Sequence, residues 1–155
     1  MLKNSFAIAC LFSLAACGTE NDDATPPPVV DPPATIEIAG EHCSNFGDTQ
    51  TISVDSWRSV GEGYDSTYQV MSYSNEDNWA VIQNPADAEW DPSKFNAIVW
   101  TEPEDGVFYT CWAGVGFDAV DLINFEDLVF DISEPEIGGC GDFPWTKLAL
   151  HCEVG

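Results

Sequence analysis

Carboxylates are the most abundant reactive side chains in this sequence. Its 155 residues carry 27 Asp and Glu against 4 Lys and Arg, a formal net charge of −23 at pH 7. Carboxylates bind calcium, and a suitably spaced pair hydrolyses glycosidic bonds. Two acidic segments are calcium candidates: Glu102, Glu104 and Asp105, and Asp131, Glu134 and Glu136. Neither segment has the Asp-x-Asp-x-Asp-Gly spacing of a calcium loop, so we interpret both first as turns exposed to solvent.

Other catalytic side chains are few. The two histidines, His42 and His151, each precede a cysteine, and the sequence has no Gly-rich phosphate loop or His-Glu-x-x-His motif. Two His-Cys pairs form a zinc ligand set, but adjacent residues of a strand point to opposite faces, which argues against such a site. We therefore predict no catalysis and no cofactor, with a carboxylate-based hydrolase of glycans as the alternative.

Four basic residues are too few for a nucleic-acid-binding face.

The N-terminal segment has the pattern of an export signal. A basic n-region at residues 1–3 precedes an apolar stretch at 6–16, which is too short to span a membrane. The stretch ends in LAACG at residues 14–18, which resembles the lipobox of bacterial lipoproteins. The resemblance implies cleavage after residue 16, palmitate-type acylation of Cys17 and anchorage in a membrane. Gly18, in place of the Asp of retained lipoproteins, favours the outer membrane.

A tether and one globular domain follow the signal. Residues 17–35 are rich in proline and acidic residues, which favours an extended, semi-rigid spacer. In residues 36–155, alternating apolar and polar positions predict an antiparallel, mostly β domain, either a sandwich or an open barrel. The expected strands are 35–39, 50–55, 67–73, 79–83, 95–100, 107–112 and 146–150. One short helix is expected after Asp118, with Leu122, Phe125 and Leu128 on one face, and residues 133–142 are expected to form a loop.

Four cysteines remain for the domain once the signal is removed and Cys17 is lipidated. An even number in an exported domain predicts two disulfides, for which three connectivities exist. We favour Cys43–Cys152, which joins the two ends of the domain, together with Cys111–Cys140, and the other two connectivities stay open. In this interpretation the histidines are partly exposed neighbours of a disulfide.

Six tryptophans are the remaining candidates for ligand contacts. Large rings bury much area in a small core, and we assign Trp100 and Trp112 to that role. Trp90 lies between Glu89 and Asp91 and just before a proline. It is the candidate for an exposed ring that stacks on a ligand such as a sugar.

Several stretches of the domain resemble a family of small, uncharacterised bacterial lipoproteins and exported proteins. These stretches are AVIQN at 80–84, DPSKF at 91–95, WT at 100–101, FYTC at 108–111, FDA at 117–119 and GCGDFPW at 139–145. The resemblance implies that the cysteines at positions 111 and 140 are paired, and it implies no activity.

The sequence as a whole predicts a non-catalytic, lipid-anchored protein of the bacterial outer membrane. Its expected partners are the membrane, through the lipid on Cys17, and an envelope protein or a glycan. A divalent cation is a further candidate, because carboxylates are so numerous.

Overall fold

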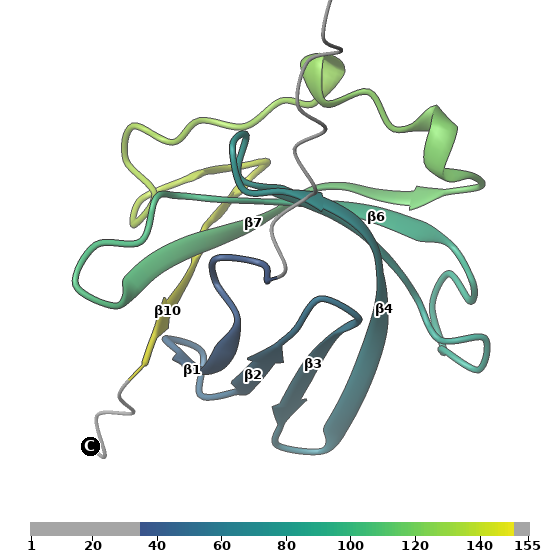
Figure 1. Ribbon diagram of the computed structural model, residues 1–155, viewed down its shortest axis with the longest axis horizontal. Coiled ribbons are helices and arrows are strands. Elements are labelled where there is room, and N and C mark those ends of the chain that lie inside the picture. Colours follow the sequence, from purple (N-terminus) through teal and green to yellow (C-terminus); the bar gives the residue numbers. More distant parts are fainter. Residues whose placement is uncertain (1–34, 151–155) are drawn as a thin grey trace, which may run out of the picture. The chain divides into compact units, whose positions relative to one another are not determined.

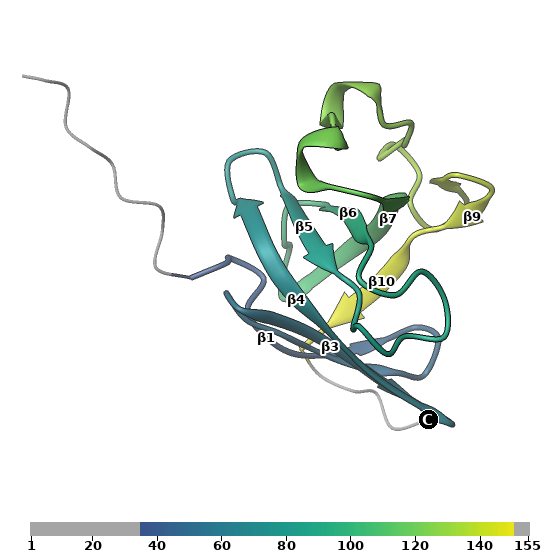
Figure 2. The same ribbon diagram turned by 90° about the vertical axis from the view of Figure 1, so that its right-hand side faces the viewer.

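The computed structural model describes residues 35–150, whose strands form a closed antiparallel barrel (Figures 1 and 2). The barrel strands are β1 (Gly40–Ser44), β2 (Thr49–Ile52), β3 (Ser56–Gly61), β4 (Tyr64–Ser74), β5 (Trp79–Gln83), β6 (Phe95–Trp100), β7 (Val107–Phe117) and β10 (Thr146–Ala149). Their order around the barrel is β1-β10-β7-β6-β5-β4-β3-β2. The first and last strands pair, with Cys43 opposite Ala149, so the barrel has no open edge. The predicted mostly β, antiparallel fold is confirmed.

Strand positions agree best where the sequence is apolar on both faces. The bounds of β5 and β6 are those predicted, whereas β7 continues to Phe117 and β4 begins at Tyr64. The prediction of a strand at 35–39 is wrong. The main-chain N–H of Ala39 instead donates to the Ile36 oxygen at 3.0 Å, which makes a turn. Ile36 and Ile38 are nevertheless buried, because their alternation with exposed residues reflects burial rather than strand pairing.

Inward-facing side chains fill one end of the barrel. Every second residue of a strand points inward, which gives a cluster of Ile36, Ile38, Ile52, Trp57, Val70, Ala80, Ile82, Ile98, Trp100, Phe108 and Leu148. Figure 1 shows the dark blue segment that precedes β1 lying within the ring of strands. We call this end, where β1 begins and β10 ends, the closed end. The opposite end, where β1 ends and β10 begins, is the open end.

His42 belongs to the closed-end core. Its ring is 3% exposed, so the prediction that it is partly exposed is wrong. The register of β1 turns residue 42 inward, where Nε2 donates to the Ile38 oxygen at 2.9 Å and the ring meets Phe108 edge-on at 4.9 Å. Burial lowers the pKa of His42, although the hydrogen bond to Ile38 opposes the shift. The imidazole is therefore neutral at pH 7.

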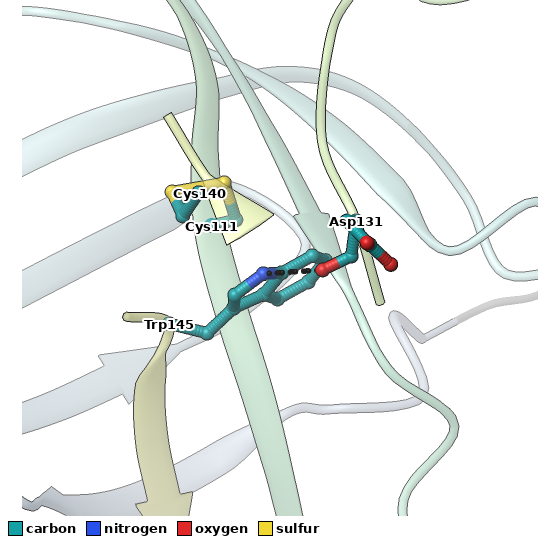
Figure 3. Close-up of a disulfide and its surroundings, with 4 residues drawn as sticks. All are labelled: Cys111, Asp131, Cys140 and Trp145. Atoms are coloured by element: carbon teal, nitrogen blue, oxygen red, sulfur yellow. Dashed lines mark hydrogen bonds between the residues drawn. A yellow bond between two sulfur atoms is a disulfide. The ribbon is translucent and has the colours of Figure 1, made fainter. Parts of the chain in front are cut away.

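Residues 118–144, which we call the strap, cross the outside of the barrel over β6 and β7 (Figure 1). The strap includes the small strands β8 (Gly139–Cys140) and β9 (Phe143–Pro144), which pair with each other. Beneath it lies a second core of Val99, Cys111, Trp145, Trp79, Tyr109, Ala113, Phe125 and Cys140. The predicted Cys111–Cys140 disulfide is present and fastens the strap to β7 (Figure 3). This cover explains why β5 to β7 are apolar on both faces.

The predicted short helix is present only as two single 3₁₀ turns, η1 (Val120–Leu122) and η2 (Phe125–Asp127). Asp118 does not cap η1 and forms an ion pair with Lys94 instead. β-branched residues and the short length disfavour an α-helix in this segment. The position of η2 is set by Phe125, which stacks on Trp79 at 4.5 Å. Within residues 35–150, no helix has the length and apolar character needed to cross a membrane.

Candidate functional site at the open end of the barrel

The open end holds a cavity of about 280 Å³, which we call the mouth cavity. Its lining comes from β2, β3, β4, β7, β10 and the β1–β2 turn, and consists of Phe46, Asp48, Gln50, Trp57, Ser59, Tyr64, Tyr68, Trp112 and Thr146. The lining therefore combines aromatic rings with hydroxyl, amide and carboxylate groups. Cavities in the mouths of β-barrels are a recurrent place for small ligands.

The strand register brings these side chains together. Gln50 lies opposite Ser59 in the β2–β3 pair, and Trp57 lies opposite Tyr68 in the β3–β4 pair. β4 and β7 are not neighbours in the sheet, yet the Tyr68 and Trp112 rings meet edge-to-face at 5.2 Å. This contact spans the barrel interior, so both rings present surface to the mouth cavity. Trp112 is 38% exposed because it lies near the open end, and its assignment to the core is wrong.

Asp48 is the one carboxylate in the described lining, and it is only 7% exposed. It accepts hydrogen bonds from Ser44 Oγ, from Gln50 Nε2 at 3.0 Å and from Ser59 Oγ at 2.8 Å. Trp57 Nε1 donates to Gln50 Oε1 at 2.9 Å, which turns the Gln50 NH₂ group towards Asp48. Burial by itself would raise the pKa of Asp48, but the hydrogen bonds outweigh it and the pKa lies below its usual value. The carboxylate is therefore ionised at pH 7.

No basic side chain of residues 35–150 neutralises Asp48. This part of the chain has three of them, and each is paired elsewhere: Arg58 with Asp65 at 2.6 Å, Lys147 with Glu136 at 3.6 Å, and Lys94 with Asp118. The hydrogen bonds to Asp48 come from neutral donors, which stabilise the ionised form without cancelling its charge. The mouth cavity thus carries a net negative charge beside aromatic rings.

The remaining predicted site residues lie away from this cavity. Trp90, in the loop between β5 and β6, is 78% exposed, as its sequence setting predicts, but is not part of the cavity lining. Glu102, Glu104 and Asp105 are exposed in the connection between β6 and β7. Of all the described residues, no three or more His, Cys, Asp or Glu side chains are placed to hold a metal ion.

The acidic residues of the strap have structural partners. Glu136 accepts a hydrogen bond from the Tyr109 hydroxyl at 2.7 Å and pairs with Lys147. The Asp131 side chain accepts from the main-chain N–H of Ser133 at 2.9 Å, and Glu134 is exposed. These contacts fasten the strap, and they give no support for a calcium site at these residues.

The other predictions about cysteines concern residues that lie partly outside the described range. Cys43 is disulfide-bonded, but Cys152 and its neighbour His151 lie beyond residue 150. The Cys43–Cys152 pairing therefore stays a prediction. Cys17, the signal and nearly all of the tether also lie outside the described residues.

A second hollow, of about 810 Å³, lies outside the barrel over β1 and β10. Its described lining has two carboxylates, Asp48 and Asp105, together with Lys147 and mostly small or aliphatic residues, and no aromatic ring contributes. It adjoins Leu150, the last described residue. The mouth cavity is the better candidate because its polar and aromatic groups converge from several strands.

The mouth cavity was not predicted from the sequence. Gln50, Ser59 and Tyr68 are polar or partly polar residues on the neighbouring strands β2, β3 and β4, and such residues are expected to face solvent. The signal that could have revealed them is an excess of aromatic residues at polar strand positions, as in Trp57-Arg58-Ser59 and Tyr64 to Tyr68.

Comparisons with known proteins add no relative. The chain matches no protein-family model, no curated protein and no solved structure.

Proposed function

We propose that this chain is a non-catalytic, lipid-anchored protein of the bacterial envelope that binds a small ligand in its mouth cavity. The observation that carries the proposal is the convergence of aromatic and polar side chains around the buried Asp48 at the open end. A closed eight-stranded barrel has an interior wide enough for one small ligand when side chains do not fill it. Here they fill the closed end and leave the open end hollow.

The lipobox resemblance at residues 14–18 supports anchorage through Cys17 in the outer membrane. The described chain is compatible with this arrangement, because Thr35 lies at the closed end, where Asn75 Nδ2 donates to its main-chain oxygen at 3.0 Å. Thr35, the first described residue, thus lies at the end opposite the mouth cavity. A ligand can enter the open end without meeting the point of attachment.

Binding is preferred to hydrolysis because of the carboxylate inventory. Two-carboxylate glycoside hydrolysis needs a second acidic group about 5–9.5 Å from the first. Asp48 is the one acidic side chain in the described lining of the mouth cavity, and hydrogen bonds from neutral donors hold it ionised. The mouth cavity therefore gives the hydrolase alternative no support.

The location of binding is tested with two tryptophan variants of the full chain, purified in detergent. A library of small neutral, anionic and cationic compounds is screened by the shift in melting temperature. We expect Trp112→Leu to abolish the shifts seen with the parent, because Trp112 lines the cavity. Trp90→Leu, a matched loss of an exposed ring outside the cavity, should retain them. Loss with Trp90→Leu alone would move the site to the β5–β6 loop, and a library without a single binder would contradict the proposal.

The anchor is tested separately. Cys17→Ser, expressed in bacteria, should give an uncleaved precursor that incorporates no labelled palmitate, because the acceptor thiol is missing. Cys10→Ser changes another cysteine of the same segment and should be processed and labelled normally. A Cys17→Ser chain with normal processing and label would refute lipidation at this residue.

A further inference from the structure

We infer that the mouth cavity takes a small organic cation, one with a protonated or methylated amine head and an apolar body. The inference rests on the proposed function and specifies the ligand class of the same site. It follows from the charge of Asp48, the aromatic rings beside it and the placement of the basic residues.

The charge of Asp48 is the first step. A buried carboxylate usually has a cationic partner, because withdrawing a charge from water is costly. The partners of Asp48 are instead Ser44, Gln50 and Ser59, all of them uncharged. These groups fix the orientation of the carboxylate and leave its charge for a ligand to compensate.

The aromatic rings are the second step. A cation is attracted to the face of an aromatic ring, most strongly to that of Trp, and the attraction grows where water is excluded. Trp112 and Tyr68 already hold each other in position at 5.2 Å, and Phe46 and Tyr64 add rings at the exposed rim. An ammonium head can therefore meet Asp48 while its carbon atoms lie against these rings.

The placement of the other charges is the third step. Arg58, Lys94 and Lys147 form their ion pairs with Asp65, Asp118 and Glu136, and none of the three pairs with Asp48. The net charge of −23 also raises the local concentration of cations around the whole chain. An anionic ligand would meet repulsion both at long range and within the cavity.

The geometry favours an organic cation over a bare metal ion. Calcium takes 6–8 oxygen ligands and commonly several carboxylates. The described lining supplies a single carboxylate, that of Asp48. Within residues 35–150, no three His, Cys, Asp or Glu side chains are placed to hold a metal ion. A volume of about 280 Å³ lies at the lower end of the range for ligand pockets, which limits the ligand to a small molecule.

The test compares cations with neutral molecules of the same shape. Choline is paired with 3,3-dimethylbutan-1-ol, and butylamine with butan-1-ol, by calorimetric titration of the full chain in detergent at constant ionic strength. We expect at least one cation to bind tenfold or more tightly than its neutral counterpart. The two pairs show whether a methylated or a primary ammonium is preferred.

Two aspartate variants assign the preference to the cavity. Asp48→Asn should reduce the cation-to-neutral affinity ratio to about one, because it removes the charge and keeps the shape. Asp55→Asn makes the same change at an exposed residue in the turn between β2 and β3, at the closed end, and should leave the ratio unchanged. If Asp48→Asn fails to fold by circular dichroism, Trp112→Leu replaces it, with the expectation that cation affinity falls at least tenfold.

Equal affinities within both pairs, or a ratio that survives in Asp48→Asn, would overturn the inference. A neutral or anionic compound whose binding depends on Trp112 would leave the proposed function standing and remove the cation class. If no compound of any class bound, both would fall.

Discussion

The indole Nε1 of Trp145 donates a hydrogen bond to the main-chain oxygen of Asp131 at 3.1 Å, directly beside the Cys111–Cys140 disulfide (Figure 3). The main-chain N–H of the same Asp131 donates to the Gly139 oxygen at 2.8 Å. The Trp145 ring thus binds the strap at Asp131, and the main chain of Asp131 in turn binds the strap at Gly139. Because Trp145 lies just before β10, it also connects the strap to the strand that closes the barrel.

Gly139→Ala should release this connection. Gly139 has a φ of +88°, and a Cβ there would lie 2.1 Å from the Asp131 oxygen that accepts the Trp145 bond. Gly141→Ala is the matched control, because its φ is +60° but a Cβ would meet no atom within 4 Å. We expect the control to lose roughly 1–2 kcal/mol of unfolding free energy and Gly139→Ala to lose about 2 kcal/mol more. Equal losses in urea titrations would contradict the steric argument.

Removing the disulfide should destabilise the strap and the barrel together. Cys111 and Cys140 are 29 residues apart, so closing that loop contributes about 3–4 kcal/mol by restricting the unfolded chain. The double variant Cys111→Ala and Cys140→Ala should lose this amount in chemical unfolding. Its tryptophan emission should also shift to longer wavelength as the Trp145 ring becomes exposed. Unchanged stability and emission would mean that packing alone holds the strap.

The barrel should become less stable as the pH is lowered, because of His42. Burial lowers the pKa of its imidazole in the folded chain, whereas the unfolded chain takes up a proton near the usual value of about 6.5. Stability is therefore complete above about pH 6.5 and is lost as pH falls from there towards the lowered pKa. His42→Gln, which retains a donor for the Ile38 oxygen, should show a smaller slope between pH 7 and 5. The same slope in both proteins would exclude His42 as its source.

The acidic surface should respond to salt without specificity. The net charge of −23 lowers stability at low ionic strength, and screening restores it. We expect sodium chloride and calcium chloride to raise the melting temperature equally at matched ionic strength, because the structure gives no support for a calcium site at the candidate acidic segments. A saturable additional rise at millimolar calcium would reveal a site that the described geometry does not contain.

The sequence predicted which residues are buried better than it predicted which segments pair as strands. Residues 79–83 and 95–100 are apolar on both faces because the barrel core lies on one side and the strap on the other, and their strands have the predicted bounds. Ile36 and Ile38 alternate with exposed residues for a different reason, since they close the barrel end without joining a strand. Periodicity alone does not distinguish these two cases.

The candidate site was harder to predict than the core. Asp48 comes from a turn, Ser59 from β3 and Trp112 from β7, so only closure of the barrel brings them together. Trp112 was assigned to the core, and Asp48 and Ser59 lie outside the predicted strands, so no role was predicted for either. That Cys111 and Cys140 are bonded was predictable because cysteines of an exported domain are usually oxidised, whereas their pairing was a preference among three connectivities that the structure confirms.

The pairing of β1 with β10 has a consequence for the order of folding. Cys43 and Ala149 are neighbours across the seam although most of the domain separates them in the chain, and contacts of such high sequence separation form late and slowly. The barrel cannot close until its last strand is available. For a chain exported as we propose, the seam would form only after residue 149 has crossed the membrane.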